Sequence, residues 1–141
     1  MSRSSHPLLV ALSLALASSL PAQNAAPAAR PDLSDPEVAH VAVTANSIDI
    51  DMAKFAQTRT TNAAVKQFAA TMITDHTAVN AQAAALASKL GVTPADNAVS
   101  QSLLTGAKQA RASLEPLHGA AFDRAYIDRE VAYHQAVLDA I

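Results

Sequence analysis

The segment from Val65 to Leu90 carries one apolar stripe that contains a histidine. Hydrophobic side chains recur there every three or four residues, the spacing of an amphipathic α-helix with one buried face. His76 lies about 20° from the centre of that face when each residue turns the helix by about 100°. A core that only packs would carry an aliphatic side chain here, so we predict a long buried helix with a polar group inside its core. The stripe consists of Val65, Phe68, Ala69, Met72, Ile73, Val79, Ala83, Leu86, Ala87 and Leu90.

The apolar part of the sequence is rich in alanine and poor in aromatic residues. Hydrophobic residues make up 50% of the 141 residues, and aromatic residues only 4%. Alanine has the highest helix propensity, whereas strands favour β-branched and aromatic side chains. A chain of this length can bury a sizeable core, so we predict a single all-α domain.

Charge and cysteine content exclude several classes of function. The formal net charge is -2 and the Lys and Arg residues are scattered, so the chain offers no basic face for nucleic acid. The absence of cysteine excludes disulfides, thiolate catalysis and thiolate metal ligands. The sequence also has no Gly-x-Ser-x-Gly elbow and no phosphate-binding glycine loop. It therefore identifies no catalytic residue, no organic cofactor site and no nucleic-acid partner.

The N-terminal segment has the pattern of a secretory signal. Arg3 precedes an apolar run of about 14 residues that is followed by Pro21-Ala22, and this run is shorter than the about 20 residues of a membrane span. We predict a signal peptide over residues 1–22, with an uncleaved anchor as the alternative. Residues 23–34 are an Ala/Pro-rich leader that we expect to be disordered. The protein is thus expected to be exported, to the periplasm in a Gram-negative bacterium, and not to be an integral membrane protein after cleavage.

Capping and stop residues divide residues 35–141 into four helices. Ser34 before Asp35-Pro36-Glu37 is typical of a helix N-terminus, and Gly91 is typical of a helix end. The last helix repeats the pattern of the central one, because Asp123, Glu130 and His134 fall within about 20° of one another on an otherwise apolar face. The expected helices run from Asp35 to about Thr58, from the Asn62 cap to Leu90, from about Asp96 to Leu114, and from Ala120 to Ile141.

Three segments resemble a known family of exported proteins. They are IDIDMAKFA, AAVKQFAATMITDHTAVN and GAAFDRAYIDREVAYHQAV. The Asp-His pair followed four residues later by Asn, and the Phe-Asp-x-x-Tyr before a His, are similar to the family catalogued as domain of unknown function 4142. The resemblance covers roughly residues 35–141. It implies a ferritin-like up-down helical bundle with a crossover helix, here Asp96 to Leu114, and no settled activity.

Members of that family continue into a further long helix past the position of Ile141, and this sequence lacks that helix. Three long helices with apolar stripes leave one wall of the core open, and each large side chain on it would gain roughly 1.5 to 3 kcal/mol from burial. We therefore expect the domain to be C-terminally incomplete. The alternatives are that a partner chain or the crossover helix covers the open wall.

Histidines and carboxylates on facing helices suggest a metal site. Imidazole nitrogen and carboxylate oxygen suit iron, manganese, zinc or copper, and the thioether of Met72 would favour copper. The Glu-x-x-His pattern of di-iron bundles is absent, because Glu130 and His134 are four residues apart. Asp49, on the shoulder of the first stripe, is interpreted as solvated or paired, with a ligand role as the alternative. The candidate ligands are His76, His134, Asp75, Asp123 and Glu130, with Asn80 near His76.

Two functions remain open. The first is a non-enzymatic protein of the cell envelope that binds a partner or a second copy, or supports stress tolerance. In that case His76 and His134 are core histidines paired with carboxylates, and they fix the register of the helices. The second is a metal-binding or redox protein that uses the two histidines. We favour the first, and the second requires both imidazoles and a carboxylate to converge to about 2.0 to 2.2 Å around one point.

Overall fold

The computed structural model describes residues 32–140, and over that range it contains helices and no strand. This confirms the predicted all-α bundle. The predicted signal peptide and most of the leader lie outside the described residues. No helix within residues 32–140 has both the length and the apolar character needed to cross a membrane. The helices are α1 (Asp35–Arg59), α2 (Ala63–Leu90), α3 (Ala98–Leu114) and α4 (Gly119–Ala140).

Side-chain caps explain where the helices begin and end. The Asn62 side chain accepts hydrogen bonds from the backbone N–H groups of Ala64 and Val65, at 2.9 and 3.3 Å. These bonds satisfy two of the donors that the first turn of α2 leaves without a helical partner. Asn97 caps α3 in the same way. α2 ends at Gly91, whose φ of 66° lies in the left-handed region that glycine adopts without strain.

Replacing Asn62 with alanine is expected to lower the free energy of unfolding by about 1 kcal/mol, because the two N–H groups lose their acceptor. Urea denaturation followed by circular dichroism measures this loss. The Asn62→Asp variant is the matched control, because its carboxylate accepts the same bonds. If Asn62→Ala and Asn62→Asp unfold at the same urea concentration, the cap does not stabilise α2.

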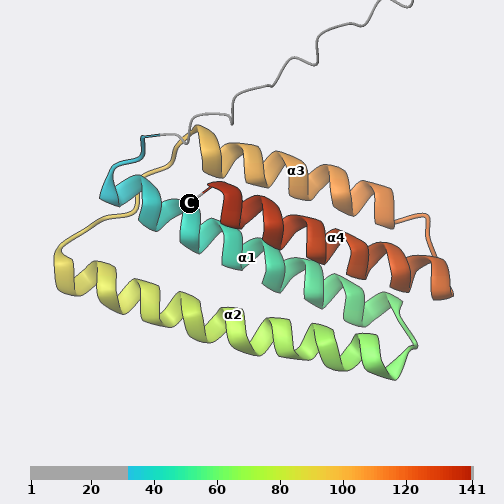
Figure 1. The fold of residues 1–141 in the computed structure, drawn as a ribbon. Helices are drawn as coiled ribbons and strands as arrows, with labels where there is room; N and C mark the ends of the chain where they lie inside the picture. Colours follow the sequence, from blue (N-terminus) through green and yellow to red (C-terminus); the bar gives the residue numbers. More distant parts are fainter. Residues whose placement is uncertain (1–31, 141) are drawn as a thin grey trace, which may run out of the picture.

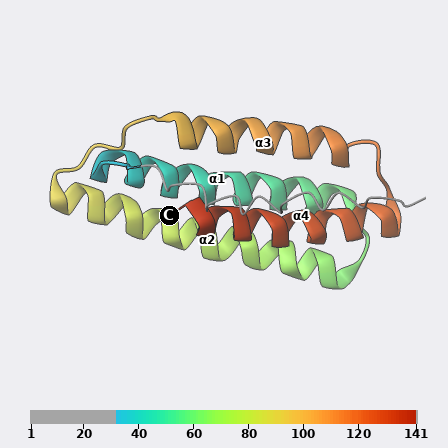
Figure 2. The ribbon, with the colours of Figure 1, turned by 45° about the horizontal axis from the view of Figure 1, so that its top comes forward.

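α1 is the central helix of the bundle. It packs on each of the other three helices, and α3 also packs on α4. α1 and α2 form an antiparallel hairpin, and the segment after α2 crosses over to α3 (Figure 1). Figure 2 shows α2 and α3 on opposite sides of the pair formed by α1 and α4. α2 and α4 run in the same direction, opposite to that of α1 (Figure 1).

Aromatic rings fill the end of the bundle near the α1–α2 turn. Phe122 and Tyr126 of α4 are both completely buried. The ring of Phe122 meets that of Phe55 edge-on, with centroids 5.8 Å apart, and Tyr126 meets Phe68 in the same way at 6.0 Å. Such edge-to-face pairs add to the free energy that burial of the rings already provides. The buried core comprises Met52, Ala53, Phe55, Ala56, Val65, Ala69, Met72, Leu114, Phe122 and Tyr126.

The apolar stripe of α2 is buried only in its first half. Val65 and Met72 are buried, whereas Val79, Leu86 and Leu90 are 46, 56 and 65% exposed. The prediction of a continuously buried face is therefore wrong for the second half. The physical reason is the placement of α3, which packs on α1 and α4 and leaves the open side of α2 uncovered. The crossover helix is thus not the cover considered as an alternative.

Candidate metal site

A buried aspartate on α1 lies at the centre of the site. Asp49 is only 3% exposed, and Ala45 and Ala53, one turn before and after it, are buried as well. Residues four apart share a helix face, so the small alanines let α1 approach its neighbours closely and bring the carboxylate inside the bundle. The expectation of a solvated Asp49 is therefore wrong, whereas the alternative of a paired Asp49 is confirmed by Arg129 of α4, and the side chain points into the bundle.

The first imidazole comes from α2, and a hydrogen bond fixes its tautomer. Nδ1 of His76 lies 2.6 Å from Oδ1 of Asn46. The Asn46 amide is oriented by its own Nδ2, which donates to the carbonyl of Ala42 at 3.0 Å. Because Oδ1 can only accept, Nδ1 of His76 carries the proton. In the neutral ring Nε2 is then left with a free lone pair.

The second imidazole comes from α4 and is held in the same tautomer. Nδ1 of His134 donates to the backbone carbonyl of Glu130 at 2.8 Å, within its own helix. A carbonyl oxygen is again only an acceptor, so Nε2 of the neutral His134 ring also carries a lone pair. Bonds of this kind, from the outer ring nitrogen to a carbonyl, orient the histidine ligands of metal sites.

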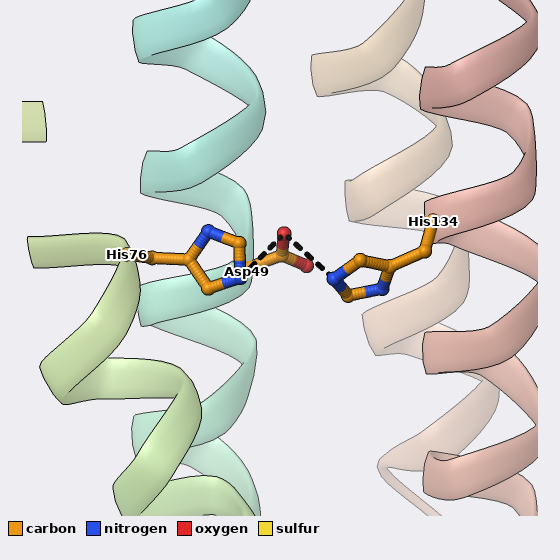
Figure 3. Close-up of side chains that lie close together, drawn as sticks. All are labelled: Asp49, His76 and His134. Atoms are coloured by element: carbon orange, nitrogen blue, oxygen red, sulfur yellow. Dashed lines mark ion pairs between the residues drawn. The ribbon is translucent and has the colours of Figure 1, made fainter. Parts of the chain in front are cut away.

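Both free nitrogens face the carboxylate of Asp49 (Figure 3). Oδ2 of Asp49 lies 3.6 Å from Nε2 of His76 and 3.8 Å from Nε2 of His134. These distances exceed those of a hydrogen bond, about 2.7 to 3.2 Å. They lie closer to the spacing of about 3.3 Å between two ligands on a tetrahedral ion with bonds of about 2.0 Å. One donor atom from each residue lies within 4.8 Å of the other two.

The second oxygen of Asp49 has a different partner. Nη1 of Arg129 lies 3.5 Å from Oδ1 of Asp49 and donates to Oε1 of Glu130 at 2.7 Å. Burial raises the pKa of the Asp49 carboxyl, and the nearby His134 and Arg129 oppose this by lowering it. Burial likewise raises the pKa of Glu130, again opposed by Arg129. The guanidinium thus holds Asp49 from one side and leaves Oδ2 to face the imidazoles.

Several buried polar atoms beside the site have no hydrogen-bond partner among the described residues. They include Oε2 of Glu130, the hydroxyl of Tyr126 and Nη2 of Arg129. Oε2 of Glu130 lies 4.0 Å from Nδ1 of His134. Burial and the negative charge of Glu130 raise the pKa of Tyr126, so the phenol stays protonated. Glu130 is therefore a buried neighbour of the imidazole pair and is not one of the three converging donors.

The structure brings together only some of the predicted ligands. His76 and His134 converge, with ring centroids 5.7 Å apart. Asp75 is exposed, although it precedes His76 in the chain, and Asp123 is half-buried and lies outside the cluster of converging donors. The sequence analysis gave too little weight to Asp49, which supplies one of the three converging donor atoms. Its spacing of four residues from two alanines was the signal that could have placed it on the buried face.

Two further side chains from the sequence hypothesis have structural roles. Met72 belongs to the buried apolar core, where a thioether packs well. Asn80 donates from Nδ2 to the hydroxyl of Ser47 at 3.3 Å, which ties α2 to α1 one turn beyond His76. Neither residue belongs to the converging group of donors found among the described residues.

A family model matches most of the chain. The family is described as a domain of unknown function, DUF4142, and the match covers residues 20–141. The chain belongs to the DUF4142 family. This confirms the resemblance seen in the sequence. No curated protein and no solved structure matches the chain, so the ferritin-like character of this DUF4142 domain stays a prediction.

His76 is expected to make the metal-free DUF4142 protein less stable at low pH. Burial, and then the neighbouring His134, lower its pKa from the ordinary value of 6.5. The unfolded chain therefore binds a proton at a higher pH than the folded protein does. The stability that uncharged His76 contributes is fully present above the pKa of His76 in the unfolded chain. It is lost as the pH falls through the lower pKa that His76 has in the folded protein.

Urea denaturation of the wild type and of His76→Asn, from about pH 7.5 to about pH 5.5, tests this. The wild type should lose more stability than the variant on acidification. The pKa values of Asp49 and Glu130 are raised, so these two groups have the opposite effect. They lower the stability of the folded protein as the pH rises above the ordinary pKa range of a carboxyl group. Both proteins carry these two groups, so the difference between their pH curves reports the loss of His76 together with any change it causes at the neighbouring Asp49. Parallel pH curves for the two proteins would contradict the prediction.

Proposed function

We propose that this protein binds a divalent transition-metal ion through Asp49, His76 and His134. One observation carries the proposal: both Nδ1 atoms are committed to acceptors, so two Nε2 lone pairs and one carboxylate oxygen face each other without a proton between them. Lone pairs in this arrangement repel one another, and a cation at their centre replaces the repulsion with attraction. This favours the metal-binding alternative over a purely architectural role for the histidines.

The donor set narrows the choice of ion. Two imidazole nitrogens and one carboxylate oxygen suit zinc and iron(II), and also accommodate manganese and copper. Three protein donors leave at least one coordination position for water or another ligand. His134 lines the groove between α2 and α4, so this groove gives access to the open position.

Metal titration of the full chain tests the proposal. Metal-free protein, prepared with a chelator, is titrated calorimetrically with zinc and, anaerobically, with iron(II). One ion bound per chain is expected, with weaker binding at lower pH because protons compete for the imidazoles. The Asp49→Asn variant should bind more weakly, whereas Asp75→Asn, an exposed acid beside His76, should not. Equal binding by the two variants would place any bound ion elsewhere.

We further propose that the protein works in an exported compartment. The support is the signal pattern over residues 1–22, with its basic residue, short apolar run and small residues before the cleavage position. Mass spectrometry of the protein made in a bacterial host that exports it should find Gln23 as the first residue. Recovery of the intact N-terminus from the cytoplasm would contradict export.

A further inference from the structure

Arg129 of α4 is held in place beside the candidate metal site. Its guanidinium carbon lies 4.1 Å from the centroid of the Tyr133 ring, and the side chain is only 11% exposed. Nη1 donates to Oε1 of Glu130 at 2.7 Å and lies 3.5 Å from Oδ1 of Asp49. The aromatic ring and the two carboxylates together fix the guanidinium against Oδ1 of Asp49.

The Tyr133 ring beneath this guanidinium is itself tied to α1. Its hydroxyl donates to the carbonyl of Ala45 at 3.2 Å, one turn before Asp49. The planar guanidinium of arginine stacks on such a ring, and a lysine ammonium would not be held in the same way. The same ring therefore contacts both the backbone that carries Asp49 and the side chain of Arg129, so the two charged groups keep their relative position.

This arrangement limits how Asp49 can bind an ion. A carboxylate binds a metal ion through one oxygen or through both. Oδ2 of Asp49 faces the two Nε2 atoms at 3.6 and 3.8 Å, whereas Oδ1 faces Nη1 of Arg129. An ion held by both oxygens would share Oδ1 with the guanidinium, and the two positive charges would repel each other. Asp49 therefore offers one oxygen, and the protein supplies three donor atoms.

We propose that Arg129 makes the site selective for zinc over manganese(II) by restricting Asp49 to one oxygen. Zinc is stable with four ligands, and three protein donors that include two imidazoles leave one position for water. Manganese(II) favours oxygen ligands in octahedral surroundings, so the loss of a carboxylate oxygen weakens its binding more. Arg129 is thus a positioning residue that acts through Asp49. Because this selection acts on the bound ion, it rests on the metal binding proposed above.

Glu130 preserves the attraction of the site for a cation. Arg129 alone beside Asp49 would cancel the negative charge of the carboxylate, and an approaching ion would gain less. Oε1 of Glu130 is the closer partner of Nη1, at 2.7 Å against 3.5 Å for Oδ1 of Asp49. One guanidinium and two carboxylates leave one negative charge for the ion. Arg129 can therefore occupy Oδ1 without making the site neutral.

The Arg129→Met, Glu130→Gln double variant tests this selectivity. It removes the guanidinium together with its closer partner, so Glu130 is not left as an unpaired buried charge. Competition titrations of the full chain give the dissociation constants for zinc and manganese(II). The ratio of the manganese constant to the zinc constant is expected to fall by about tenfold in the double variant, an effect typical of residues that orient a ligand. Glu130→Gln alone keeps Arg129 and is the matched control, which should retain the wild-type ratio.

Cobalt(II) absorption of the wild type gives a second measurement that needs no variant. Cobalt(II) occupies zinc sites, and its visible bands are intense in tetrahedral surroundings and weak in octahedral ones. The wild type is expected to show intense bands. Weak bands, or an unchanged ratio in the double variant, would overturn the role of Arg129 and leave the metal site itself standing. A wild type that binds neither zinc nor manganese(II) would overturn both.

Discussion

Saturating zinc should raise the free energy of unfolding of the wild-type protein by about 3 to 4 kcal/mol, and the His76→Ala, His134→Ala double variant should gain almost nothing. A ligand that binds only the folded state stabilises it by about 2.7 kcal/mol at one hundred times its dissociation constant, and by about 4.1 kcal/mol at one thousand times. The two Nε2 atoms face Oδ2 of Asp49 at 3.6 and 3.8 Å, so removing both leaves a single carboxylate oxygen. Thermal and urea denaturation with and without metal measure the difference.

The control for this experiment removes a histidine elsewhere. His118 is exposed, so His118→Ala should keep the full metal-dependent stabilisation. Metal content by mass spectrometry of each purified protein gives a second, independent measurement. If the double variant is stabilised as much as the wild type, the converging histidines do not bind the ion, and their role is the fixing of helix register.

Replacing Phe122 with alanine should cost about 3 to 5 kcal/mol of stability, because the change removes a fully buried ring and leaves a cavity. Phe122 is 0% exposed and packs between Phe55 and Tyr126, with centroid distances of 5.8 and 6.3 Å. A small domain is stable by only about 5 to 15 kcal/mol, so this loss is a large fraction of the total. Urea denaturation at equilibrium measures it.

Leu90→Ala is the matched control for this second result. Leu90 is 65% exposed at the end of α2, and a surface substitution of this kind changes stability by about 0.5 kcal/mol or less. A loss at Phe122 no larger than that at Leu90 would show that the aromatic cluster is not the centre of the core.

Much of the fold could be predicted because helix boundaries are local. Ser34, Asn62 and Gly91 mark their helix ends through the conformation and hydrogen bonds of their own turn, and the structure places helix ends beside each of them. The third helix begins at Ala98, two residues after the expected start, because Asn97 is the residue that caps it. Such signals need no knowledge of the neighbouring helices.

The residues of the candidate site could be predicted only in part from the sequence. His76 and His134 could be identified because a polar residue inside an apolar stripe is visible in the periodicity. Asp75 and Asp123 share those stretches of sequence, yet they lie outside the converging group. Which carboxylate faces the histidines depends on how α1 is rotated against α2 and α4, and the sequence of one helix does not contain that rotation. Asp49 was therefore assigned to the shoulder of its helix.

The sequence by itself determined the all-α class, the helix ends and the two unusual histidines, because composition, capping and periodicity act within one helix. Only the tertiary structure decided the rest. It put Asp49 between the imidazoles, set Arg129 against its other oxygen, and left the second half of the α2 stripe exposed. These features arise from packing between helices that are distant in the chain. They depend on the positions of several helices at once, and a local pattern cannot specify those positions.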